Sequence, residues 1–136
     1  MRVVLAATAI MLLMSACGGN NSRLDVLSED PMANPTLSFT EPDRHRETEG
    51  DSSTIIGSPA AAEISTAFDV PLGQFEIAEG ELLGQAERAG YLMEEIGFNE
   101  RDRGSILYQG WRTTDDGSRI LLRLLFTPGS VQVRLM

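Results

Sequence analysis

The chain has 136 residues and a formal net charge of −9 at pH 7, with one cysteine, one histidine and no lysine. This length allows one small folded domain. The acidic balance argues against nucleic-acid binding, which needs a basic surface for phosphates. A single cysteine excludes an intrachain disulfide.

Residues 1–16 have the three parts of a secretory signal peptide. Arg2 supplies the positive charge, residues 3–14 are apolar except for Thr8, and two small residues follow. As a helix, the apolar stretch is about 20 Å long, which is short for a bilayer core of about 30 Å. We therefore expect an export signal and not a membrane-spanning helix.

The junction Leu13-Met14-Ser15-Ala16-Cys17 resembles the lipobox of bacterial lipoproteins: an apolar residue, two small residues and a cysteine. It differs from the commonest pattern in having Met14 where leucine is usual. The resemblance implies that Cys17 carries a diacylglycerol thioether and becomes the acylated N-terminus. Two or three fatty-acyl chains, palmitate among them, make a stable membrane anchor.

The same resemblance implies an exported protein that is lipid-anchored to the cell envelope. In a host with two membranes, Gly18 after the cysteine is similar to the outer-membrane sorting signal of enterobacterial lipoproteins. The protein would then lie on the periplasmic side of the outer membrane. In other hosts it would lie on the outer face of the cell membrane.

Residues 17–57 have the composition of a lipidated N-terminus followed by a flexible linker. Pro31, Pro35 and Pro42 interrupt the stretch, and residues 41–51 are nearly all charged or polar. Such a segment buries too little apolar surface to offset the entropy of ordering. We expect a disordered tether of about 40 residues with a typical span of about 35 Å.

The folded domain is predicted to cover residues 58–136 and to begin with helices. Ser58 and Pro59 favour a helix start, which predicts a short helix over 60–68. The patterns of 59–68 and 74–78 also fit a strand or a loop. The next helix is clearer, because five apolar residues fall on one face before Gly97: Leu82, Ala86, Ala89, Met93 and Ile96.

Three strands are predicted after this helix, over 105–114, 118–127 and 131–135. Asp115-Asp116-Gly117 and Pro128-Gly129 mark the two tight turns between them. The predicted fold class is α+β: one or two helices packed on a three-stranded antiparallel β-meander, preceded by a disordered tether. This order of elements is similar to that of several small envelope lipoproteins, including accessory subunits of the outer-membrane β-barrel assembly machinery, although no motif matches them.

No residue pattern points to an enzyme, a cofactor or a metal site. His45 stands alone in the predicted tether, and there is no lysine base. Glu94 and Glu95 would diverge by about 100° on a helix. Asp115 and Asp116 suit a turn. We expect a non-enzymatic protein without catalytic residues, metal or cofactors.

The predicted domain separates its charges. Residues 76–100 hold seven glutamates and one arginine, whereas 101–136 hold six arginines and three aspartates. Ion pairing between helix and sheet, with a solvated acidic face, is one interpretation. The other is an arginine-rich and aromatic sheet face that binds a protein partner. Its candidate residues are Tyr108, Trp111, Arg112, Arg119, Leu121 and Arg123.

These patterns predict a non-enzymatic, membrane-anchored envelope lipoprotein. Its small domain would bind a protein partner as an accessory or structural subunit, and the last strand, as a sheet edge, could pair with a strand of that partner. The alternative is a module that binds a small envelope ligand between helix and sheet. That alternative predicts a pocket around Met93 and Trp111.

Overall fold

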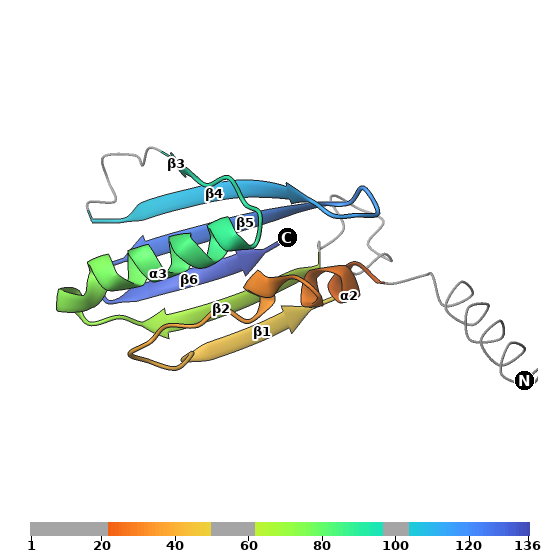
Figure 1. The fold of residues 1–136 in the computed structure, drawn as a ribbon. Helices are drawn as coiled ribbons and strands as arrows, with labels where there is room; N and C mark the ends of the chain where they lie inside the picture. The colour runs from red at the N-terminus through yellow and green to blue at the C-terminus, as the bar shows by residue number, and fades with distance from the viewer. Residues whose placement is uncertain (1–21, 50–61, 97–103) are drawn as a thin grey trace, which may run out of the picture.

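A computed structural model describes residues 22–49, 62–96 and 104–136. Its strands form one antiparallel sheet in the order β1-β2-β6-β5-β4-β3, and α2 and α3 lie on the same face of it (Figure 1). The elements, in chain order, are α2 (Arg23–Ser28), η1 (Pro31–Ala33), β1 (Arg44–Thr48), β2 (Glu63–Asp69), η2 (Leu72–Gln74), α3 (Phe75–Arg88), β3 (Glu94–Ile96), β4 (Ile106–Thr113), β5 (Arg119–Thr127) and β6 (Ser130–Leu135).

The predicted three-stranded meander is wrong, because the sheet has six strands. The three strands β4, β5 and β6 and both of their turns form as predicted. However, three further strands extend the sheet on both sides. The last strand, β6, lies between β2 and β5 and is therefore no edge. The described edges are β1 and β3.

Strand β2 replaces most of the short helix that was expected over 60–68. Ile64, Thr66 and Phe68 alternate inward and are buried, as in a strand with one covered face. Pairing with β6 places Ile64 opposite Leu135 and Phe68 opposite Val131. This tertiary partner overrides the helix-favouring alanines of the segment.

Helix α3 (Phe75–Arg88) confirms the predicted helix around Leu82 and Ala86 and includes residues 75–78, whose pattern was ambiguous, but it ends earlier than its apolar spacing suggested. Gly90 has φ +96°, and Tyr91 N–H donates to the Ala86 carbonyl at 3.0 Å, as in a Schellman C-cap. Only glycine adopts this left-handed conformation at low cost. The chain then turns back, so Met93 and Ile96 belong to the extended segment that enters β3 and not to the helix.

The flexible linker predicted over 17–57 is wrong for residues 22–49, which are part of the fold. Ser22 caps α2 in a capping box with Asp25. Leu27 and Met32 are buried in the same core as β2, β5 and β6. The folded domain therefore includes Ser22 onward and not only 58–136. The predicted leader, Cys17 and the other linker residues lie outside the described residues.

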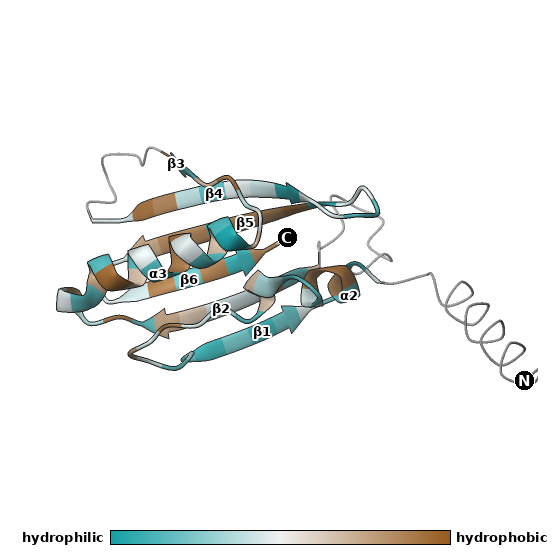
Figure 2. Cartoon of the chain, in the orientation of Figure 1, coloured by the Kyte–Doolittle hydropathy of each residue, from teal (hydrophilic) through white to brown (hydrophobic). Residues whose placement is uncertain are grey.

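The core lies between the sheet and the helices. Its largest side chains come from β2, β5 and β6, and Ala78, Leu82 and Ala86 of α3 pack against them. Figure 2 shows β5 mainly hydrophobic and β1 hydrophilic. All five residues of β1 are exposed, and their charges protect this sheet edge from unwanted pairing.

Within the described ranges, no helix has both the length and the apolar character needed to cross a bilayer.

Candidate functional site

The six predicted partner-binding residues are divided between the two faces of the sheet. Side chains alternate along a strand, so Tyr108 and Arg112 of β4 point to the helix-covered face. Trp111 points to the opposite face, which we call the open face. Register places Trp111 beside Leu121 and brings Arg119 and Arg123 of β5 to the same side. Four of the six residues therefore share one surface.

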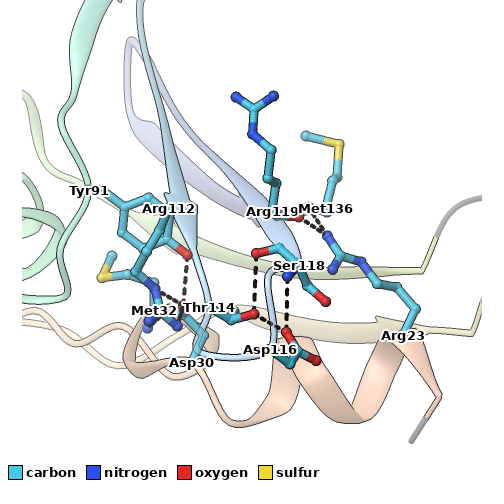
Figure 3. A network of polar contacts seen from close by, with 10 residues as sticks. All are labelled: Arg23, Asp30, Met32, Tyr91, Arg112, Thr114, Asp116, Ser118, Arg119 and Met136. Atoms are coloured by element: carbon cyan, nitrogen blue, oxygen red, sulfur yellow. Dashed lines mark hydrogen bonds and ion pairs between the residues drawn. The ribbon is translucent and has the colours of Figure 1, made fainter. Parts of the chain in front are cut away.

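Arg112 belongs to a buried polar cluster with Asp30 and Tyr91 (Figure 3). Asp30 Oδ2 accepts hydrogen bonds from Arg112 Nη2 at 2.6 Å, Arg112 Nε at 3.0 Å and the Tyr91 hydroxyl at 2.7 Å. Asp30 Oδ1 accepts from Met32 N–H at 2.8 Å. Burial and the neighbouring Asp30 carboxylate raise the pKa of Tyr91. All polar atoms of the carboxylate are satisfied, so the cluster joins parts of the fold and is closed to a ligand.

This cluster fastens the N-terminal segment to β4, and α3 holds the segment at two more points. Gln85 Nε2 donates to the Thr36 carbonyl at 2.6 Å, and Gln85 Oε1 accepts from Thr36 N–H at 3.0 Å. Glu81 Oε2 accepts from Ser38 N–H at 3.0 Å, and the bonds from Ser38 lower the pKa of Glu81. These contacts leave no local signal in the sequence, because their partners lie 43 to 82 residues apart in the chain.

Tyr108 is also used within the fold. Its ring packs edge-on against Phe126, with ring centroids 5.9 Å apart. Its hydroxyl donates to Glu79 Oε2 at 3.1 Å. Burial, together with the hydrogen bond and charge of Glu79, raises the pKa of Tyr108 to about 12. Tyr108 and Arg112 therefore connect the sheet to the layer above it.

On the open face, Trp111 and Arg119 form an exposed pair. Trp111 is 45% exposed, and the Arg119 guanidinium lies 4.4 Å from its ring centroid, which is a cation–π contact. Beside them, Leu121 is only 9% exposed and therefore adds little apolar surface to this face. Trp111 and Arg119 thus expose an aromatic ring with a cation stacked on it.

Arg123 lies further along the same face, directly opposite Arg134 of β6. Arg134 forms a two-pronged ion pair with Glu63, at 2.7 and 3.0 Å, and this bond lowers the pKa of Glu63. Arg123 donates only to the neutral Gln109, at 2.9 Å. Within the described residues, the charge of Arg123 has no acidic partner.

A hollow of about 290 Å³ adjoins Trp111 at the β3–β4 edge. Leu92 and Ile96 on its rim are exposed, Leu92 by 80%. Gly110 lets the chain cross closely here, because a Cβ at this position would lie 2.6 Å from the Leu92 carbonyl oxygen. The hollow is lined by Leu92, Glu94, Ile96, Gln109, Gly110 and Trp111.

A second apolar surface lies at the opposite end of the sheet. Two neighbouring hollows of about 640 and 380 Å³ share Val70, Leu72 and Gly129 in their linings. Leu72 is highly exposed, and Ile77 in the first turns of α3 is half exposed. This end is a natural control for experiments on the open face.

The expected ion pairing between helix and sheet is not found among the described residues. The sheet arginines pair with Asp30 and Glu63, which lie outside α3. The α3 glutamates with described side-chain bonds are Glu79 and Glu81, which bind a tyrosine and a backbone N–H. The acidic helix and the arginine-bearing open face are therefore separate electrostatic surfaces.

The carboxylates considered for catalysis do not converge. Glu94 and Glu95 lie in β3, where neighbouring side chains point to opposite faces. Asp116 closes the β4–β5 turn by accepting from Thr114 Oγ1 and Ser118 N–H, and these bonds lower its pKa to about 2. His45 Nδ1 lies 2.9 Å from Thr66 Oγ1. The described part of the chain groups no three potential metal ligands.

Comparison of the chain with protein-family models, curated proteins and solved structures found no match.

Proposed function

We propose that the protein is a non-enzymatic, membrane-anchored envelope lipoprotein whose folded domain binds a protein partner as an accessory or structural subunit. Cys17 is the proposed lipid attachment site. The observation that supports partner binding is the sheet-face patch, which we define as Leu92, Ile96, Trp111, Arg119, Leu121 and Arg123 on the open face and its β3–β4 edge.

The composition of the sheet-face patch is that of a binding surface. Tryptophan and arginine are enriched among residues that dominate binding energy, and exposed apolar neighbours exclude water around them. Leu92 and Trp111 are exposed, although the core nearby is tightly filled. Adjacent exposed apolar groups of this kind mark interaction sites more often than scattered ones do.

The arginines of the patch favour an acidic partner surface. Arg119 stacks on Trp111, and Arg123 bonds to an uncharged amide. An incoming carboxylate at Arg123 would gain a charge-assisted hydrogen bond without breaking an existing ion pair. Complementary charge also speeds association, and the glutamates of α3 would repel the same acidic partner from the opposite side of the domain.

The packing between α3 and the sheet disfavours the alternative of a small ligand bound there. The interface between α3 and the sheet is filled by buried side chains, including Leu82, Leu124 and Phe126. The hollow beside Trp111 opens on the other side of β4 and its edge. A ligand between helix and sheet would have to displace core side chains, at a cost of several kcal/mol.

The lipid anchor is tested by labelling cells with a fatty-acid analogue and comparing wild type with Cys17→Ser. We expect label and membrane association in wild type only. Mass spectrometry of the wild-type N-terminal peptide should give Cys17 with its acyl groups. An unlabelled wild-type protein, or an intact residue 1–16 segment in the mature form, would exclude the anchor.

Partner binding is tested by cross-linking in intact envelopes with Leu92→Glu/Arg123→Glu against Leu72→Glu. Both variants change exposed or half-buried side chains, and Leu72→Glu controls for an added charge at the far end. Losing a binding hot spot worth about 2 kcal/mol weakens a complex about 30-fold. We expect the double variant, and not Leu72→Glu, to lose its cross-linked partner. The reverse result would place the binding site at the far end.

A further inference from the structure

Arg23, the first residue of α2, contacts the end of the sheet that carries Trp111. Arg23 Nη2 donates to the carbonyl oxygen of Arg119 and, at 3.1 Å, to that of Met136 (Figure 3). The Arg119 side chain stacks on Trp111. Two contacts therefore connect the start of α2 to the exposed tryptophan. The far end of the sheet, at Thr127 and Gly129, is a full length of β5 away.

The chain between Cys17 and Ser22 is too short to let the domain turn freely. Five peptide steps extend to about 18 Å at most. Strand β5, with nine residues, is about 30 Å long. An acylated Cys17 therefore keeps the Arg23 end near the bilayer. The end that carries Leu72 cannot face the bilayer, because the chain would have to span the whole sheet.

Charge and side-chain type indicate which of the two faces of the sheet would turn toward the bilayer. The open face carries Arg46 of β1, Arg119 and Arg123 of β5 and Arg134 of β6 against Glu63, Asp69 and Glu94, whereas α3 presents Glu76, Glu79, Glu81 and Glu87 on the other side. An anionic lipid surface attracts the first and repels the second. Tryptophan is also the residue most typical of the membrane–water interface.

We propose that the Trp111–Arg119 pair rests on the membrane surface, with the indole among the lipid headgroups and the guanidinium beside their phosphates. The β4–β5 turn next to it carries Asp115 and Asp116, whose negative charge opposes deeper insertion. Contact is thus confined to headgroup depth. This inference rests on the proposed anchor at Cys17, and it supplies the lipid surface as a binding partner.

The sheet-face patch is then divided between the lipid surface and the protein partner. Trp111 and Arg119 face lipid, while Arg123, Leu92 and Ile96 remain for the protein partner, which has to approach the domain beside the membrane. For this reason the partner-binding test above changes Leu92 and Arg123 and leaves the Trp111–Arg119 pair intact.

The chain offers one cysteine and one tryptophan, which together make the experiment direct. The chain from Cys17 onward, which contains every described residue, is coupled through Cys17 to maleimide lipid in vesicles of phosphatidylethanolamine and phosphatidylglycerol. Trp111 emission is then measured with a nitroxide quencher on the headgroup or deep in the acyl chain. We expect about a twofold loss with the headgroup quencher, a smaller loss with the deep one, and a blue shift of the emission.

The matched control moves the reporter to the far end, as Trp111→Phe with Leu72→Trp. We expect no quenching there. A flexible insertion of about 30 residues after Gly18 should weaken quenching of Trp111, since the typical span of the tether then rises to about 30 Å or more. Equal quenching at both positions, or none at Trp111, would overturn the inference. So would a Trp111 that is unquenched on vesicles and instead cross-links to a protein in the envelope.

Chemical coupling makes the result independent of cellular acylation. Failure of the anchor proposal would appear in the Cys17→Ser labelling experiment, whereas failure of the orientation proposal would appear only in the quenching pattern.

Discussion

Two arginine–carboxylate pairs, one on each face of the same sheet, differ in how far they are buried and in which elements they join. Arg112 and Asp30 meet on the helix-covered face, where the Asp30 side chain is fully buried. Arg134 and Glu63 meet on the open face, where the side chains stay 35% and 27% exposed. Both pairs are long-range, 82 and 71 residues apart in the chain, but the first attaches a segment outside the sheet, whereas the second joins strands β6 and β2, which already pair through their backbones.

This difference indicates what each face contributes. A buried carboxylate without its partner has a large desolvation cost, so the Asp30 cluster makes attachment of the N-terminal segment nearly all-or-none. An exposed pair is solvated in either state and adds little. We therefore expect substitutions of paired charges on the covered face to change stability strongly, and substitutions of paired charges on the open face to change it little.

The largest expected effect comes from breaking the covered pair with Asp30→Ala. Arg112 and the Tyr91 hydroxyl would lose their shared acceptor inside the fold. We expect the free energy of unfolding in urea to fall by about 3 kcal/mol. Asp43→Ala, which removes an exposed contact with Arg44 at 3.8 Å, should change it by less than about 0.5 kcal/mol. Similar losses in the two variants would refute the contrast between the faces.

An intermediate effect is expected at Gly110 of β4, where the segment that leads into β3 passes close to the strand. In Gly110→Ala, the new methyl group would lie 2.6 Å from the Leu92 carbonyl oxygen and 2.7 Å from Met93 Sδ. We expect a loss of about 2 kcal/mol and a displacement of β3, visible as faster amide exchange at Glu94–Ile96. Gly80→Ala, in α3 with no atom within 4 Å, should instead stabilise by about 0.5–1 kcal/mol. A neutral Gly110→Ala would mean that β3 adjusts freely.

The smallest effect is expected at the open pair and depends on pH. The hydrogen bond from Arg134 lowers the pKa of Glu63 below its ordinary value of 4.5, although burial acts against it. A lowered folded-state pKa contributes stability above pH 4.5 that is lost as the pH falls through the folded pKa. Glu63→Gln should therefore cost about 1 kcal/mol at pH 7 and progressively less in acid. A cost that is independent of pH would assign the effect to packing.

The strands that could be predicted from sequence were those with local signals. Alternating apolar residues in β5 and β6, together with Asp115-Asp116-Gly117 and Pro128-Gly129, determine the hairpins without any distant partner. Strand β2 also alternates, at Ile64, Thr66 and Phe68, but its alanines and the preceding Ser58-Pro59 favoured a helix. Pairing with β6 decided the outcome.

The N-terminal segment shows the limit of composition as a guide. Its few apolar residues have no period, and prolines interrupt them, which is typical of a linker. What holds it is a buried aspartate whose partners lie 61 and 82 residues away. The local traces were the helix caps at Ser22 and Asp30.

The candidate site could be predicted in part. Alternation along β4 and β5 already puts Trp111, Arg119, Leu121 and Arg123 on one face. The same rule separates Tyr108 and Arg112 from Trp111, because residues an odd number of positions apart along a strand point to opposite faces. The contribution of Leu92 could not be anticipated, because the expected helix continued through it.

The order of strands has a consequence for how the chain is made. Strands β1 and β2 form one hairpin, β3, β4 and β5 form a second group, and only β6 hydrogen-bonds to both. Since β6 follows all the other described strands in the chain, the two groups cannot be joined into one sheet until β6 has been made. Completing the sheet is therefore a late and long-range step of folding, because the pairing that locks the domain waits for its last described strand.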